Sequence, residues 1–269
     1  MMKPLFRAYE GYAPSAGGIC AITLLFLAGV ALGSVVVAPL ARFFPPSRAL
    51  EYTQLISYPL MFVPAMIYAG FRKAGKRTAL DTQSPGGVFA PVAVVLTLVA
   101  AFMTDALTSV LPDMPENLKT AMEAITDGTL WVNLVCVSVF APFFEEWLCR
   151  GIVQRGLLAA GKSPVVAIGV SALFFALIHM NPWQAIPAFV LGCLFGYVYY
   201  KTGSLKLTML MHCANNTFSV FCTRMDCFED AQTWLDVMPA KWYWLSFAAC
   251  ALLLVLCIRV FKKSETPCW

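Results

Sequence analysis

Long apolar stretches recur along this chain, and they restrict its fold more than any other feature of the sequence. Charged and turn-forming residues gather in the short segments between them. A helix needs roughly 20 apolar residues to cross the hydrocarbon core of a bilayer, and most of the stretches approach or exceed that length. Because 59% of the 269 residues are hydrophobic and only 13% are charged, too few charges exist to cover a water-soluble globule. The sequence therefore predicts an all-α, polytopic transmembrane helical bundle.

The segments between the stretches predict about eight spans and their orientation. Arginine and lysine are densest at 72–77, and the positive-inside rule places that cluster in the cytoplasm. Eight spans then put both termini in the cytoplasm and two acidic loops outside. We expect one membrane-embedded domain, 1–269, in the inner membrane if the source is bacterial. The spans are expected at about 17–41, 52–71, 86–111, 130–160, 164–180, 183–200, 205–223 and 241–260.

The charges and the cysteines exclude other partners and raise one open question. The net charge of +4 comes from the connecting segments, and no basic stripe runs between aromatic residues, so nucleic acid is not an expected partner. Most of the ten cysteines lie inside apolar stretches and are expected to be packing residues. Cys222 and Cys227 flank a loop placed outside, where a disulfide is chemically allowed. Two free thiols are at least as consistent with the sequence.

Two carboxylates and a guanidinium interrupt the fourth apolar stretch at Glu145, Glu146 and Arg150. A charged side chain at the centre of a spanning helix costs about 2.5–3.5 kcal/mol, so three of them are rarely accidental. Helical spacing places Glu146 and Arg150 on one face, where they can pair. Glu145 points about 100° away, toward a different neighbour. We expect Glu146 to be occupied by its pair and Glu145 to be available for chemistry.

Both histidines of the chain also lie inside apolar stretches, His179 in the fifth and His212 in the seventh. Asn216 follows His212 by one helical turn and projects from the same face, whereas Asn215 points elsewhere. Because each polar group in lipid needs a partner, we expect these residues to cluster with the acidic pair. Simple span arithmetic puts Glu145, His179 and His212 at different depths. Tilt, or a fifth helix seated deeper in the bilayer, is then required.

This set of side chains can hydrolyse an amide bond in two ways. A carboxylate beside an imidazole can take a proton from water, while an imidazole and an amide stabilise the oxyanion. Equally, His179, His212 and Glu145 form a three-ligand set for a catalytic zinc ion with one open position. No cofactor is therefore certain, and zinc is the one to consider. The residues do not choose between a metal-free and a metal-bound water.

Three motifs on successive stretches resemble those of the CPBP family, which includes CAAX prenyl proteases, bacteriocin-processing proteins and abortive-infection proteins. The resemblance covers about 130–223, which would be the catalytic core. The motifs are Glu145-Glu146-x-x-x-Arg150, Phe175-x-x-x-His179 and His212-x-x-x-Asn216.

The resemblance implies a membrane-embedded endopeptidase, either a glutamate protease or a metalloprotease. Its substrate would be a peptide or protein in or near the bilayer, such as a prenylated or leader peptide. Glu145 would activate water with help from His179, and His212 and Asn216 would stabilise the oxyanion. The paired residues of the first motif would brace the site, and the phenylalanine of the second would pack beside an imidazole.

Other functions fit part of the pattern. A catalytically inactive membrane scaffold or bacteriocin-immunity protein could keep the polar cluster for helix packing. A transporter with a proton relay is weakened because no internal repeat or pair of broken helices is evident. A haem bound by the two histidines would give a visible absorption spectrum.

Overall fold

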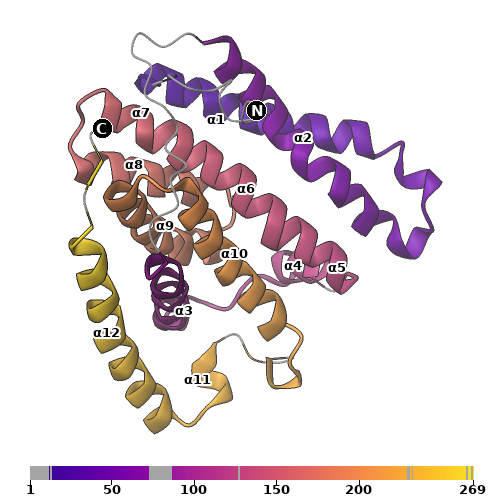
Figure 1. Ribbon diagram of the computed structural model, residues 1–269. Helices are drawn as coiled ribbons and strands as arrows, with labels where there is room; N and C mark the ends of the chain where they lie inside the picture. Colours follow the sequence, from indigo (N-terminus) through magenta and orange to yellow (C-terminus); the bar gives the residue numbers. More distant parts are fainter. Residues whose placement is uncertain are drawn as a thin grey trace.

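The structure is a computed structural model that describes residues 12, 14–72, 87–126, 128–228, 231, 233–264, 266, 267 and 269. Helices make up all the regular secondary structure of these residues (Figure 1). The α-helices are α1 (Ala16–Val37), α2 (Ala49–Phe71), α3 (Phe89–Thr108), α4 (Glu116–Thr126), α5 (Leu130–Asn133), α6 (Ala141–Glu146), α7 (Arg155–Ala159), α8 (Pro164–Leu177), α9 (Pro182–Thr202), α10 (Leu205–Cys222), α11 (Trp234–Val237) and α12 (Ala240–Lys262). Short 3-10 turns lie at Ala41–Phe43, Pro46–Arg48 and Asp226–Phe228.

The predicted all-α, multi-pass membrane architecture is confirmed. Each of the eight expected spans coincides with a helical segment of the described chain. Five segments are long and apolar enough to cross a membrane: α1, α2, α3, the continuous helix Leu130–Ala159 and α12. Helix α8 is a shorter apolar helix. The number of crossings and the cytoplasmic position of both termini remain predictions, and residues 73–77 of the basic cluster lie outside the described chain.

One connecting segment differs from the sequence-based expectation, and another answers a question that the sequence left open. The acidic segment after α3, expected to be a loop, contains helix α4. Asn181 anchors this helix, since its Nδ2 donates to Met122 Sδ at 3.1 Å. Cys222, the last residue of α10, and Cys227, in the 3-10 turn that follows, are both free thiols, so the disulfide considered from the sequence is not formed.

The helix from Leu130 to Ala159, here called the motif helix, contains two π-helical stretches, Leu134–Phe140 and Trp147–Gln154. The first precedes Pro142, whose ring and missing N–H disrupt an α-helix. In this stretch the Ala141 N–H donates to the carbonyl of Cys136, five residues back. The wider π turn leaves room for the proline, so the helix continues to the acidic pair without a break.

Helices α1 and α2 form a hairpin along one side of the motif helix (Figure 1). Gly29 allows their backbones to approach closely, because a Cβ there would collide with the carbonyl oxygen of Met61. The adjacent residue of α2, Phe62, stacks its ring on Phe144 with centroids 5.1 Å apart. The hairpin is thereby fixed beside the residue that precedes Glu145.

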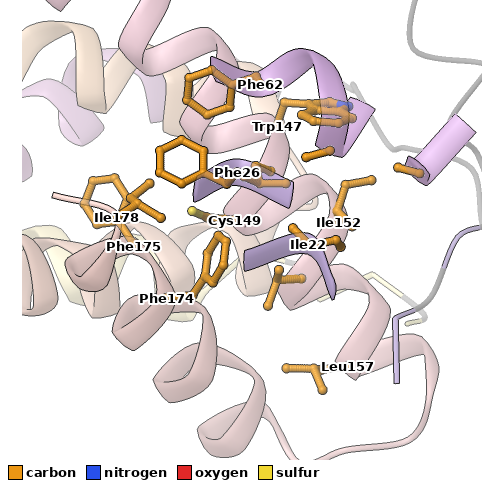
Figure 2. Packing of buried hydrophobic residues seen from close by; sticks show 14 of the residues in the cluster. Ile22, Phe26, Phe62, Trp147, Cys149, Ile152, Leu157, Phe174, Phe175 and Ile178 are labelled. Carbon is orange, nitrogen blue, oxygen red and sulfur yellow. The ribbon is translucent and has the colours of Figure 1, made fainter. Parts of the chain in front are cut away.

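The main apolar core surrounds the motif helix (Figure 2). Phe26 of α1 and Phe62 of α2 meet Trp147 of the motif helix in this core, and Phe174 and Phe175 of α8 close it from another side. Trp147 is only 1% exposed. The hairpin and α8 therefore hold the motif helix between them, which fixes the positions of its charged side chains.

Candidate active site

Glu146 lies at the centre of a buried polar cluster. Its Oε1 accepts hydrogen bonds from Arg150 Nη1 at 2.7 Å and from His212 Nδ1 at 3.1 Å. Glu146 and Arg150 have no exposed surface, and His212 is 3% exposed. The pair predicted from the four-residue spacing is therefore present, and it also holds an imidazole from α10.

Arg150 makes further contacts that a buried cation requires. Its Nη2 donates to the carbonyl of Gly192 in α9 at 2.9 Å. The guanidinium also lies over the rings of Phe175 and Phe195, 4.6 Å and 5.6 Å from their centroids. Such cation–π contacts partly replace the hydration that the cation loses. Arg150 thus ties the motif helix to α8 and α9 as well as to Glu146.

Glu145 faces a different neighbour from Glu146, as the helical spacing predicts. Its Oε1 accepts a hydrogen bond of 2.6 Å from the Tyr58 hydroxyl of α2. Its Oε2 is buried and has no hydrogen-bond partner among the described residues. This second oxygen lies 4.0 Å from His212 Nε2. One carboxylate oxygen is therefore held by a hydrogen bond, and the other has no hydrogen bond and lies beside an imidazole.

His212 stands between the two carboxylates. Since Nδ1 contacts the Glu146 carboxylate, which only accepts, Nδ1 carries a proton. Nε2, the nitrogen that faces Glu145, is then the one left for chemistry. The Phe175 and Phe195 rings enclose the imidazole, with centroids 5.3 Å and 5.9 Å from its own.

His179 does not lie within a helix, in contrast to the sequence-based expectation. Helix α8 ends at Leu177, and His179 lies in the turn before α9. Met180 turns the chain sharply with a φ of 52°, a left-handed conformation that is rare for a residue with a side chain. His179 Nδ1 lies 2.8 Å from the carbonyl oxygen of Phe175, so Nδ1 donates and Nε2 is free to accept a proton.

Both histidines pack against the ring of Phe175. Its ring centroid lies 5.0 Å from that of His179 and 5.3 Å from that of His212. The predicted packing of Phe175 beside an imidazole is confirmed, and this ring is a neighbour that His179 and His212 share. However, no ion pair joins His179 to Glu145 in the described chain, and His212 is the imidazole that faces Glu145.

Asn216 is oriented by the backbone of the motif helix. Its Nδ2 donates to the carbonyl of Val137 at 2.8 Å. In the π register this carbonyl would receive an N–H from residue 142, but Pro142 has none. The amide of Asn216 donates the hydrogen bond that the Val137 carbonyl would otherwise lack. The same amide nitrogen keeps a second N–H for another acceptor. Asn215, expected to point elsewhere, donates to Asn216 Oδ1 at 3.1 Å.

The donors do not form a metal-binding group. In the part of the chain that the structure describes, no three His, Cys, Asp or Glu side chains are arranged to hold a metal ion. The tentative zinc set of His179, His212 and Glu145 is therefore not formed, because these three side chains are not arranged around one point. The Nδ1 atoms of the two rings bond Glu146 and the Phe175 carbonyl, and each ring keeps its Nε2. No step of the proposed reaction is therefore assigned to a metal.

Two contributors to the site were not predicted from the sequence. Tyr58 lies in α2, far from the motifs, and no spacing connects it to Glu145. The second is a pair of α9 glycines four residues apart, whose carbonyls accept from the motif helix: Arg150 bonds Gly192, and Gln154 Nε2 bonds Gly196 at 2.7 Å. A small-x-x-x-small pattern in α9 is a signal that could have indicated this close packing.

Comparison with known proteins supports the motif-based resemblance. A family model described as type II CAAX prenyl endopeptidase Rce1-like matches residues 127–218. The chain is 24% identical over 184 residues to the membrane-embedded CAAX protease MroQ of Staphylococcus aureus (strain USA300), covering 65% of this chain and 74% of that protein. No solved structure matches. Both matches confirm the resemblance to the CPBP family.

Proposed function

Because the chain resembles the CPBP family and matches two CAAX-protease comparisons, we propose that it is an intramembrane endopeptidase. Its substrate is a membrane-associated peptide. The names of the matched family and relative suggest a prenylated CAAX peptide, and the motif resemblance adds a leader peptide as the alternative. The observation that supports this most directly is the open Glu145 oxygen, buried without a hydrogen-bond partner among the described residues and 4.0 Å from His212 Nε2.

Glu145 is the proposed general base. Its Oε2 takes a proton from water while the water oxygen bonds to the carbonyl carbon, and the carbonyl electron pair moves onto oxygen. When the C–N bond breaks, the leaving nitrogen receives the proton from Glu145. His179 is proposed to assist, because its Nε2 is the ring nitrogen left to accept a proton.

His212 and Asn216 are proposed to stabilise the oxyanion. A protonated His212 directs its Nε2–H toward the space beside Glu145, and Asn216 offers its second amide N–H from one turn further along α10. Donors fixed in advance in a site of low dielectric stabilise developing charge strongly. Glu146 and Arg150 hold the His212 ring in this orientation and take no part in bond breaking.

The proposal is tested with purified protein in lipid vesicles and a panel of peptides. The panel pairs a prenylated CAAX peptide with its unprenylated form and adds apolar leader peptides, and mass spectrometry identifies the cleavage site. His212→Gln is expected to lower kcat by about 100- to 1000-fold, the effect of losing one oxyanion donor. Cys213→Ala, the adjacent residue, serves as the control and should cleave normally.

Two outcomes would contradict this function. No cleavage of any peptide by the wild type would favour a scaffold or immunity protein. Full activity of His212→Gln would remove His212 from the oxyanion site. A chelator series with measured metal content is run in parallel, and loss of activity together with stoichiometric zinc would replace the metal-free mechanism.

A second prediction concerns Pro142. Pro142→Ala restores an N–H that competes with Asn216 for the Val137 carbonyl, so Asn216 loses its anchor. We expect kcat to fall by about tenfold, since small displacements of a catalytic group are costly. Thermal stability should not fall, because alanine is favoured over proline by about 3 kcal/mol in a helix interior.

The test measures kcat and the unfolding midpoint for Pro142→Ala, for Asn216→Ala and for the double variant. If Pro142 acts through Asn216, the proline substitution should have no further effect on kcat in the Asn216→Ala background. Full activity of Pro142→Ala, or a further loss in the double variant, would disprove the link between the two residues.

A further inference from the structure

In the described chain, the hydroxyl of Tyr58 on α2 donates a hydrogen bond to the Glu145 carboxylate. The Tyr58 oxygen lies 2.6 Å from Glu145 Oε1. A bond of this length from a hydroxyl is typical of an ionised acceptor, and such bonds are roughly twice as strong as neutral ones. Tyr58 therefore contacts the residue that the proposed reaction needs most.

This bond determines which oxygen of Glu145 remains without a hydrogen bond and faces His212. A carboxylate can rotate about its last torsion, which is broad and roughly two-fold, so either oxygen can take either place. Tyr58 fixes Oε1, and the buried Oε2 then faces His212 Nε2, 4.0 Å away. Without the hydroxyl, nothing in the described contacts would hold the carboxylate in this orientation.

The position of Tyr58 is itself fixed by aromatic packing. Phe62 follows Tyr58 by one turn on the same face of α2, and their ring centroids are 5.9 Å apart. Phe62 is 1% exposed and stacks on Phe144, the neighbour of Glu145. A second connection lies near the amino-terminal end of the motif helix, where Thr129 donates to Glu51 Oε2 of α2 at 2.5 Å. Helix α2 is thus attached to the motif helix at two levels.

Tyr58 also lies outside the segment that the family model matches, residues 127–218. From these contacts, we infer that Tyr58 is a positioning residue for the Glu145 carboxylate, supplied to the site by the α1–α2 hairpin. The inference rests on the proposed function, because the role matters only if Glu145 is the base. It makes the amino-terminal hairpin part of the catalytic unit.

The test compares Tyr58→Phe with the matched control Tyr52→Phe in the full chain, reconstituted in lipid vesicles. Tyr52 lies on the same helix, and its ring packs on Phe44, 5.3 Å away. Tyr58→Phe removes one oxygen atom and is expected to lower kcat by about tenfold to a hundredfold, the typical effect of losing a hydrogen bond to a charged group. KM and the unfolding midpoint should stay near those of the wild type, and Tyr52→Phe should leave all three unchanged.

Glu145→Gln and the double variant Tyr58→Phe/Glu145→Gln complete the experiment. Tyr58 acts through Glu145, so its substitution should not lower the residual activity of Glu145→Gln further. If Tyr58→Phe does not fold, 3-fluorotyrosine at position 58 keeps the ring and the hydroxyl and changes only the donor strength. This replacement is expected to change kcat severalfold at constant KM.

The outcomes separate this inference from the proposed function. A wild type that cleaves, together with Tyr58→Phe or 3-fluorotyrosine protein of unchanged kcat, would overturn the role of Tyr58 and leave the protease intact. Equal losses in Tyr58→Phe and Tyr52→Phe would also overturn it. A wild type that cleaves no peptide would remove both.

Discussion

Glu145→Gln is expected to abolish peptide cleavage and to leave the helical bundle folded. Glutamine has nearly the same shape, and its amide oxygen can still accept the hydrogen bond from Tyr58. It cannot take a proton from water, so kcat should fall by about 10²- to 10⁴-fold, the usual contribution of general base catalysis. The measurement is kcat on the cleaved peptide, with circular dichroism and the unfolding midpoint as folding controls.

Two further variants sharpen this result. Glu145→Asp keeps the carboxylate but withdraws it by one methylene from Tyr58 and His212, so it should recover only part of the activity. Glu116→Gln changes an exposed carboxylate on α4 and should behave as the wild type. Substantial cleavage by Glu145→Gln would show that another group activates the water.

Arg150→Ala is expected to have the largest effect on stability. The substitution leaves Glu146 fully buried without its cation and removes the bond to Gly192 and the contacts with Phe175 and Phe195. Breaking a buried ion pair in this way costs about 3–5 kcal/mol. Because proteins are stable by only about 5–15 kcal/mol, the yield of folded protein and the unfolding midpoint should both drop sharply.

The double variant Glu146→Gln/Arg150→Gln is the matched comparison. It removes both charges, so no uncompensated carboxylate stays buried, and its loss of stability should be smaller than that of Arg150→Ala. Arg150→Lys keeps the charge but cannot reach Glu146 and Gly192 together, and should be intermediate. Normal yield and a normal midpoint for Arg150→Ala would contradict the bracing role of the pair.

Helical spacing was sufficient to predict the contacts that lie within one helix. Four residues separate Glu146 from Arg150, and the structure contains that pair. The same geometry predicts that Glu145 turns to another neighbour, and it does. The cost of polar groups in lipid was also a good guide, because His212 joins the acidic pair although it lies 66 residues away in sequence.

Most contacts between helices could not be predicted from the sequence and became known only from the structure. Tyr58 belongs to a span with no motif, and its bond to Glu145 depends on how the α1–α2 hairpin lies against the motif helix. The end of α8 was placed too late, because the apolar stretch runs on to Ile178 while the left-handed turn at Met180 ends the helical path. The segment that forms α4 was predicted to be a loop, because its charged residues indicated only that it is exposed to solvent.

The π turns of the motif helix affect how related chains should be aligned. One residue more or less in an ordinary α-helix rotates every later side chain by about 100°. The stretch Leu134–Phe140 can compensate for such a change by switching from π to α hydrogen bonding, because a π turn contains one residue more than an α turn. We therefore expect homologues that are one residue shorter in this stretch still to present both carboxylates to the same partners.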